Sequence, residues 1–141
     1  YSHINPKNSY TSWNQILGHH IGPNSDEIFL QAAYNFSEKL RFNFDYQYIR
    51  NGQNIYDSQG NLVFNAGGDA FVTHRDIVDP IRIEFLDGER INQNIFTFNV
   101  KYEPFRNFIF DLFIRETMSK NITRDITNNS SYGYLRLMFE L

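Results

Sequence analysis

The chain has 141 residues, a net charge of −3 and no cysteine. This composition excludes a disulfide framework and thiolate metal sites, and the lack of a basic patch argues against a nucleic-acid partner. Mean hydropathy is −0.50, and no apolar run reaches the length of about 18 residues that a membrane-spanning helix requires. These values do not exclude a membrane β-barrel, because only one face of each of its strands is apolar.

Aromatic residues are unusually frequent, with 14 Phe, 9 Tyr and 1 Trp making up 17% of the chain. Membrane barrels concentrate aromatic side chains at both lipid–water interfaces. The aromatic excess therefore favours a membrane barrel over other all-β classes.

In chain order, a short strand is possible near Tyr10–Asn14, and Gln15–Glu27 reads as a loop because it holds two glycines and a proline. Five stronger strand patterns follow, at Ile28–Phe36, Leu40–Arg50, Ile95–Tyr102, Phe108–Thr117 and Tyr132–Leu141. We expect an all-β chain of about five or six antiparallel strands.

The strands alternate between a charge-free apolar face and a face that carries the charged residues. Successive side chains of a strand point to opposite faces, so Phe42 and Phe44 share one face and Asn43 and Asp45 the other. The five apolar faces total 23 residues without a charge. An Arg or Lys at the lipid midplane costs about 2–4 kcal/mol, so a lipid-facing set should exclude charge. The opposite faces carry the charges that we assign to the barrel lumen: Arg41, Asp45, Lys101, Asp111, Arg115, Arg136 and Glu140.

The predicted connections alternate in length. Ser37–Lys39 and Glu103–Asn107 are short turns, whereas Asn51–Asn94 and Met118–Ser131 are long and polar. Small hairpins are expected inside the longest connection, near Asp57–Gly60 and Leu86–Glu89. Outer-membrane barrels have short periplasmic turns and long external loops, so this alternation predicts an external loop over about 51–94 and a bacterial outer-membrane location.

Five or six strands cannot close a transmembrane barrel, which needs at least about eight. An open edge in lipid would leave backbone N–H and C=O groups without partners. We therefore expect residues 1–141 to be the C-terminal portion of a larger barrel, a processed product or fragment whose remaining strands lie upstream of Tyr1. The last strand is similar to outer-membrane assembly signals, with Leu141 where Phe is usual.

Alternation also fits a soluble antiparallel sandwich or a lipocalin-like carrier, in which the aromatic face would form the core. Strand length, loop alternation and aromatic residues at strand ends favour the membrane.

One segment carries a more specific likeness. The aromatic lead-in Tyr10–Trp13, the run Leu17-Gly18-His19-His20-Ile21-Gly22-Pro23 and the Arg50-Asn51-Gly52 that ends the second strand resemble the capsule-assembly Wzi family of outer-membrane proteins. The resemblance covers residues 1–52. It implies a large barrel with an occluded lumen that binds or tethers capsular or other surface polysaccharide as a lectin, without catalysis.

Trp13, His19 and His20 are the candidate polysaccharide contacts, because an indole can stack on a sugar and an imidazole can bond a hydroxyl. The alternatives are an interfacial Trp13 and histidines that only pack the loop. We expect no metal and no cofactor. Two adjacent histidines in a loop point in different directions, and no carboxylate except Asp26 lies at a ligand-like spacing.

Two acid–arginine couples on single strands, Asp45 with Arg41 and Asp111 with Arg115, could suggest a glycosidase. We interpret them as internal ion pairs, because mixed charges in an occluded lumen must be paired. No phosphate loop, catalytic triad or Cys/His pair is present, so we predict a protein that is not an enzyme. A porin-like or substrate-specific channel is the alternative function.

Overall fold

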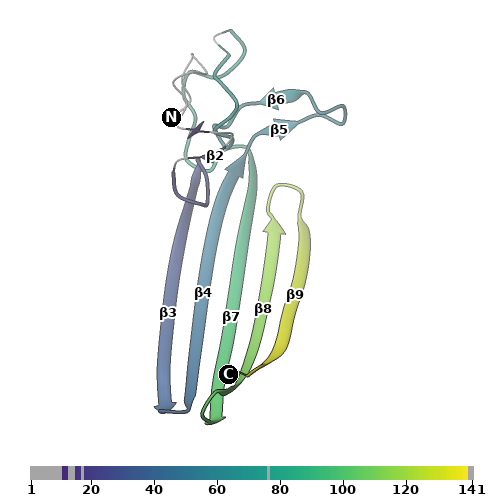
Figure 1. The fold of residues 1–141 in the computed structure, drawn as a ribbon. Helices are drawn as coiled ribbons and strands as arrows, with labels where there is room; N and C mark the ends of the chain where they lie inside the picture. Colours follow the sequence, from purple (N-terminus) through teal and green to yellow (C-terminus); the bar gives the residue numbers. More distant parts are fainter. Residues whose placement is uncertain (1–10, 13–14, 17, 76, 140–141) are drawn as a thin grey trace. The chain divides into compact units, whose positions relative to one another are not determined.

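The computed structural model describes residues 11–12, 15–16, 18–75 and 77–139, and side chains from Gly18 onward (Figure 1). The predicted residues Trp13, Glu140 and Leu141 lie outside these ranges. The chain divides into two compact units. Unit 1 comprises residues 1–27, 49–92 and 120–126, and unit 2 comprises residues 28–48, 93–119 and 127–141.

All five predicted strands are present and form one antiparallel sheet in the order β3-β4-β7-β8-β9 (Figure 1). Each extends beyond its predicted bounds: β3 is Ser25–Ser37, β4 Leu40–Gln53, β7 Glu89–Phe105, β8 Phe108–Asn121 and β9 Ile126–Phe139. The described strands do not close into a barrel. In the described part of the chain, no helix is long and apolar enough to cross a membrane.

The two predicted short turns lie in unit 2 and are tighter than expected. Glu38-Lys39 joins β3 to β4, and Arg106-Asn107 joins β7 to β8, with Asn107 at a φ of 67°. Asparagine tolerates this left-handed conformation better than most residues. The Lys39 Nζ atom donates a 2.8 Å hydrogen bond to the Pro104 carbonyl, so the two turns are linked to each other.

The predicted loop Met118–Ser131 is wrong. Met118–Asn121 belong to β8 and Ile126–Ser131 to β9, so only the four residues 122–125 form the turn. Polar residues such as Thr127 and Asn128 suit a strand when a neighbouring strand supplies the backbone partners, and alternation of apolar residues cannot reveal such a segment.

The connection between β4 and β7 is shorter than predicted, because it covers residues 54–88 rather than 51–94, and it holds one of the two predicted hairpins. A hairpin of β5 (Ile55–Tyr56) and β6 (Leu62–Phe64) surrounds the predicted turn at Asp57–Gly60. The second predicted hairpin is wrong, since Leu86 and Gly88 form a turn that leads directly into β7. Both residues have positive φ values, 66° and 91°, which change the direction of the chain at the turn. No strand precedes this turn at residues 81–88, so no hairpin forms there. Two further short strands, β1 (Thr11–Ser12) and β2 (Gln15–Ile16), pair near the start of the chain.

The apolar side chains of unit 2 are largely exposed among the residues that the structure describes. Leu30, Phe36, Leu135 and Phe139 are each more than half exposed. Among the described residues of unit 2, Ile95 is the one fully buried apolar side chain. A sheet normally buries its apolar face against another layer, so the exposure of these apolar side chains is unusual for a folded sheet.

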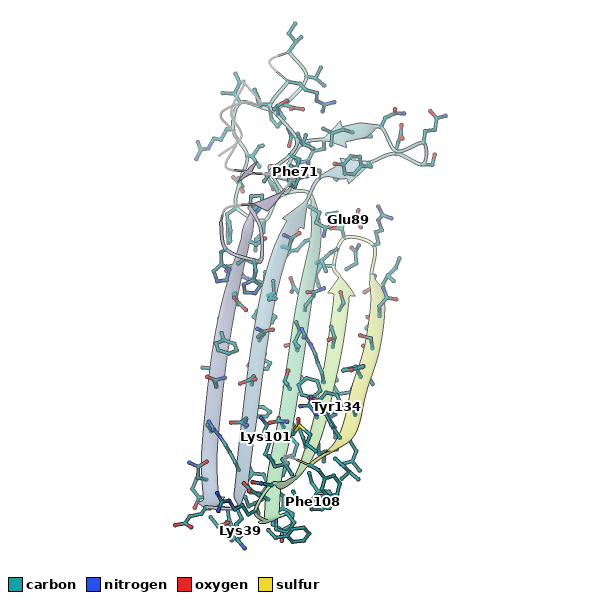
Figure 2. The ribbon with its side chains drawn as sticks, viewed as in Figure 1. Lys39, Phe71, Glu89, Lys101, Phe108 and Tyr134 are labelled. Atoms are coloured by element: carbon teal, nitrogen blue, oxygen red, sulfur yellow. The ribbon has the colours of Figure 1, made fainter. Side chains whose placement is uncertain are left out.

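Aromatic rings cluster at the end of unit 2 that carries the tight turns. Phe108 is the centre of the cluster, with its ring centroid 5.0 Å from that of Phe105, 4.8 Å from Phe110 and 4.4 Å from Phe139. Figure 2 shows both Phe108 and Lys39 at this end of the sheet. Farther along the same face, the Tyr46 hydroxyl donates a 2.8 Å hydrogen bond to Asn94 Oδ1. From Asn94 toward the start of β7 this face becomes polar, so its apolar band on β7 runs from Phe96 to Tyr102.

Candidate functional site

A polar cleft of about 560 Å³ lies in unit 1. Amide, carboxylate, phenol, imidazole and guanidinium groups line it, from His20, Asn51, Gln53, Asn54, Tyr56, Asp69, Glu89 and Arg124. This mixture of donors and acceptors can bond hydroxyl groups, and the ring of Tyr56, 41% exposed, offers an apolar surface. The residues come from three separate stretches of the chain, so the cleft exists only in the folded protein.

One wall of the cleft holds a charge cluster around Glu89. Arg124 Nη2 lies 2.6 Å from Glu89 Oε2, and Asn121 donates a hydrogen bond to Glu89 Oε1. Glu89 is the first residue of β7, Asn121 is the last residue of β8, and Arg124 lies in the turn between β8 and β9. The Glu89 side chain is mostly buried and that of Arg124 is half exposed, so the guanidinium is the charged group available to a ligand.

Asn24 ties together three stretches of unit 1. Its backbone has a φ of 49°, and its carbonyl accepts from Gly52 N at 2.9 Å. Its side-chain Nδ2 donates to the Gly52 carbonyl at 2.8 Å and to the Asp87 carbonyl at 3.1 Å, while its Oδ1 accepts from Leu86 N at 2.8 Å. A Cβ at Gly52 would collide with the Asp87 carbonyl and with the Asn24 amide. The Asn24–Gly52 contact therefore requires glycine.

An ion pair between Arg50 and Asp26 links the end of β4 to the start of β3. The Arg50 Nε atom donates to Asp26 Oδ1 at 2.9 Å, and Nη2 contacts the other carboxylate oxygen. This hydrogen-bonded guanidinium lowers the pKa of Asp26, against a smaller opposing effect of desolvation. The Arg50 that carried the family resemblance thus pairs with Asp26 within unit 1.

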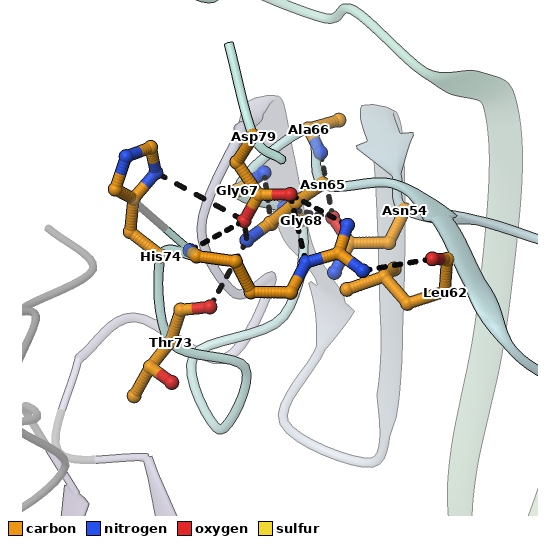
Figure 3. Close-up of polar contacts among 10 residues, drawn as sticks. Asn54, Leu62, Asn65, Ala66, Gly67, Gly68, Thr73, His74 and Asp79 are labelled. Carbon is orange, nitrogen blue, oxygen red and sulfur yellow. Dashed lines mark hydrogen bonds and ion pairs between the residues drawn. The ribbon is translucent and has the colours of Figure 1, made fainter. Parts of the chain in front are cut away.

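A second polar cluster holds the segment between β6 and β7 (Figure 3). Asp79, 6% exposed, accepts from Arg75 Nε at 2.9 Å, from Arg75 N at 2.8 Å and from Asn65 Nδ2 at 2.9 Å. Arg75 also donates from Nη1 to the Leu62 carbonyl at 2.9 Å. The hydrogen bond from Arg75 lowers the pKa of Asp79 to about 2, although burial opposes the shift. Asn54 completes the cluster by accepting from Ala66 N and Gly68 N.

The predicted contacts His19 and His20 are exposed, with ring centroids 4.3 Å apart. His19 Nε2 lies 3.6 Å from Glu27 Oε2, and His20 Nε2 lies 3.6 Å from Glu27 Oε1. The carboxylate beside the histidines is therefore Glu27 and not Asp26, which bonds Arg50. Of the three predicted contacts, His20 lines the cleft, and Trp13 lies outside the described residues.

The predicted ion pair of Asp111 with Arg115 is wrong. Asp111, 1% exposed, pairs with Arg136 of the neighbouring strand, with 2.6 Å between Oδ2 and Nη2, and accepts a 2.6 Å bond from Asn99 Nδ2. Residues four apart in a strand are separated by about 13 Å, whereas facing residues on adjacent strands are about 5 Å apart. Pairing must therefore be between strands.

The other members of the predicted charged set have different neighbours. Asp45 accepts a 2.9 Å hydrogen bond from Gln31 Nε2 of the adjacent strand, so the expected couple with Arg41 is also not the contact that the structure shows. Arg41 and Lys101 line a smaller cleft of about 430 Å³ in unit 2, near the tight turns. Glu140 lies outside the described residues.

The polar face of β8 and β9 also carries aromatic rings. Phe113 and Tyr134 are stacked, with centroids 5.2 Å apart and planes 9° apart, and Tyr132 lies 6.1 Å from Phe113. The Arg136 guanidinium lies 5.6 Å from the Tyr134 ring centre. Figure 2 shows Tyr134 on the sheet of unit 2.

Sequence reasoning missed Glu27, Asn24, Glu89 with Arg124, and the cluster around Asp79. A signal existed for Asn24 alone, because Gly-Pro-Asn marks a turn whose asparagine can bond backbone groups. No protein-family model, curated protein or solved structure matches this chain.

Proposed function

We propose that this chain is part of an outer-membrane β-barrel that binds surface polysaccharide without cutting it. The observation that carries the proposal is the uncovered apolar face of the five-stranded sheet. Lipid would cover this face at a gain of about 25 cal/mol for each Å² removed from water.

The open sheet supports a larger barrel. β3 and β9 are its edge strands, and in lipid their free backbone groups would cost several kcal/mol each. Further strands that pair with β3 and β9 would remove this cost. The aromatic cluster around Phe108 then suits one lipid–water interface, and the hydrogen-bonded Tyr46 suits a level nearer the other.

The cleft of unit 1 supports polysaccharide binding. Its groups can bond sugar hydroxyls, and Tyr56 can stack on the apolar side of a sugar ring. The resemblance of residues 1–52 to the Wzi family points to the same class of ligand. We place Trp13 and His19 at the binding surface together with His20.

The test uses detergent-purified full-length protein and the host's surface polysaccharide. Retention of polymer and polymer chain length are both measured for the native protein and for Tyr56→Ala, Trp13→Ala and His19→Ala. Phe71→Ala is the matched control, because Phe71 is an exposed aromatic residue of unit 1 that does not line the cleft. Lower retention in these three variants, unchanged retention in the control and constant chain length are expected. Shortened polymer would show an enzyme, and no retention by the native protein would refute the lectin.

A substrate-specific channel is the second candidate, favoured by the rings of Phe113, Tyr132 and Tyr134 on the polar face. In a closed barrel this face would line the lumen, where stacked rings beside Arg136 could guide a sugar or an anion. Ion conductance in planar bilayers that falls when sugar is added would favour the channel.

A further inference from the structure

We propose that His19, His20 and Glu27 form a binding site for a divalent transition-metal ion, with Zn²⁺ as the best-fitting class. This goes beyond the proposed function and departs from the expectation, based on sequence, that the chain binds no metal. One potential ligand atom from each of the three side chains lies within 4.8 Å of the other two.

The distances suit a shared ion better than direct hydrogen bonds. Each histidine Nε2 atom is 3.6 Å from a Glu27 oxygen, which is longer than a normal hydrogen bond. Two ligands bound to one zinc ion at about 2.0–2.1 Å are about 3.3 Å apart at the tetrahedral angle. A shift of a few tenths of an ångström would bring each histidine–carboxylate pair to that separation, whereas the two imidazoles, whose ligand atoms lie within 4.8 Å of each other, can have farther to move toward a shared ion.

Glu27 supplies an independent observation. Its side chain is only 9% exposed, and its buried Oε1 atom has no hydrogen-bond partner among the described residues. A buried carboxylate oxygen without a partner is costly, and it is normally satisfied by a charged group or a metal ion. The atom nearest to this oxygen among the potential ligands is His20 Nε2.

The backbone holds the three side chains in place. Gly22, at a φ of 80°, donates from its N to the His19 carbonyl at 3.1 Å and closes the turn after the histidines. The Ser25 hydroxyl donates to the Pro23 carbonyl at 2.9 Å, so the turn continues directly into β3 and Glu27. Asp26 points to Arg50 instead, which leaves Glu27 as the carboxylate of this site.

The set of ligands indicates the ion. Two imidazoles and one carboxylate suit zinc and its neighbours in the first transition row, whereas calcium and magnesium prefer oxygen ligands alone. Both histidine side chains are 62% exposed, so water can complete the coordination.

Calorimetric titration of the detergent-solubilised full-length protein with Zn²⁺ tests the site. The variants are His19→Ala, His20→Ala and Glu27→Gln, the last of which keeps the shape of the side chain and removes its charge. His74→Ala is the matched control, because His74 also lies near a carboxylate, that of Asp79, but Arg75 and Asn65 already bond that group. Each site variant should lower Zn²⁺ affinity at least about tenfold, and the control should leave it unchanged.

A second measurement protects the test against variants that misfold. X-ray absorption of the native protein with one equivalent of Zn²⁺ should show only nitrogen and oxygen ligands, with the scattering pattern of two imidazoles. Native affinity in all three site variants, or a native spectrum without imidazole, would overturn the proposal. Neither measurement includes polysaccharide retention, so the proposed metal site and the proposed lectin function are tested independently.

Discussion

Asp111 of β8 and Arg136 of β9 form an ion pair across adjacent strands, with 2.6 Å between Oδ2 and Nη2. The carboxylate is 1% exposed and also accepts a hydrogen bond from Asn99 of β7. One buried acid thus links three neighbouring strands on the polar face of the sheet.

Removing Arg136 should destabilise the protein more than removing Arg115. Arg136→Gln leaves a buried carboxylate with one fewer charged partner, and we expect a clear loss in the free energy of unfolding. Arg115→Gln should change it by less than about 0.5 kcal/mol, because the side chain is exposed. Urea unfolding in detergent measures both.

Combining each change with Asp111→Asn completes the experiment. Arg136 and Asp111 should show a coupling energy of about 1 kcal/mol, whereas Arg115 and Asp111 should be additive. Equal coupling for the two arginines would contradict the pairing between strands.

The five long strands could be predicted because period-two alternation depends on local sequence alone. Their ends could not, since β8 and β9 continue through polar residues such as Thr127 that adopt a strand only when a partner strand is present. The same reason explains the wrong ion pairs. Sequence spacing shows which face a charge occupies, but register between strands decides its neighbour.

The candidate site could be predicted only in part. His19 and His20 are candidates because they lie in the run that carries the resemblance and an imidazole can bond a hydroxyl, but Glu27, seven residues after His20, stands at the start of a strand pattern without any distinguishing feature. The cleft assembles residues from three distant stretches, and nothing local to Glu89 indicates its contact with Arg124.

Asn24 should be essential for the stability of unit 1. Asn24→Ala removes three side-chain hydrogen bonds, each worth about 1 kcal/mol, and places alanine at a positive φ. Asn24→Gly tolerates the backbone conformation and should lose only the hydrogen bonds. Amide hydrogen exchange at residues 50–54 and 84–88 should rise most in the alanine variant, and unchanged exchange in both variants would refute this role.

Acid should loosen the segment that Asp79 holds. The pKa of Asp79 is about 2 in the folded protein and about 3.9 in an unfolded chain, so its stabilising effect is complete above pH 4 and is lost as the pH falls toward 2. The shift corresponds to about 2 kcal/mol. Proteolysis at residues 62–79 with an acid-stable protease should accelerate over this range.

Asp79→Asn provides the comparison for acid sensitivity. The variant should be cleaved faster at pH 6 and should lack the acceleration that Asp79 causes between pH 4 and 2. Parallel pH profiles for the variant and the native protein would exclude Asp79 as the responsible group.

The long connection between β4 and β7 and the short turns should lie on opposite sides of the membrane. An epitope inserted at Gly60, in the exposed turn between β5 and β6, should be labelled on intact cells. An epitope at Asn107, in the turn between β7 and β8, should be labelled only after the outer membrane is opened. The reverse pattern would overturn the proposed topology.

Lipid contact of the apolar face is the central claim, and adjacent single-cysteine spin labels test it most directly, because the native chain has no cysteine. Phe98 is on the apolar face of β7 and Thr97 is on the polar face. In liposomes, we predict that a label at Phe98 relaxes with membrane-dissolved oxygen and is shielded from a water-soluble nickel chelate, while a label at Thr97 shows no preference for oxygen. Equal oxygen and nickel accessibility at the two positions, or nickel access at Phe98, would contradict the account.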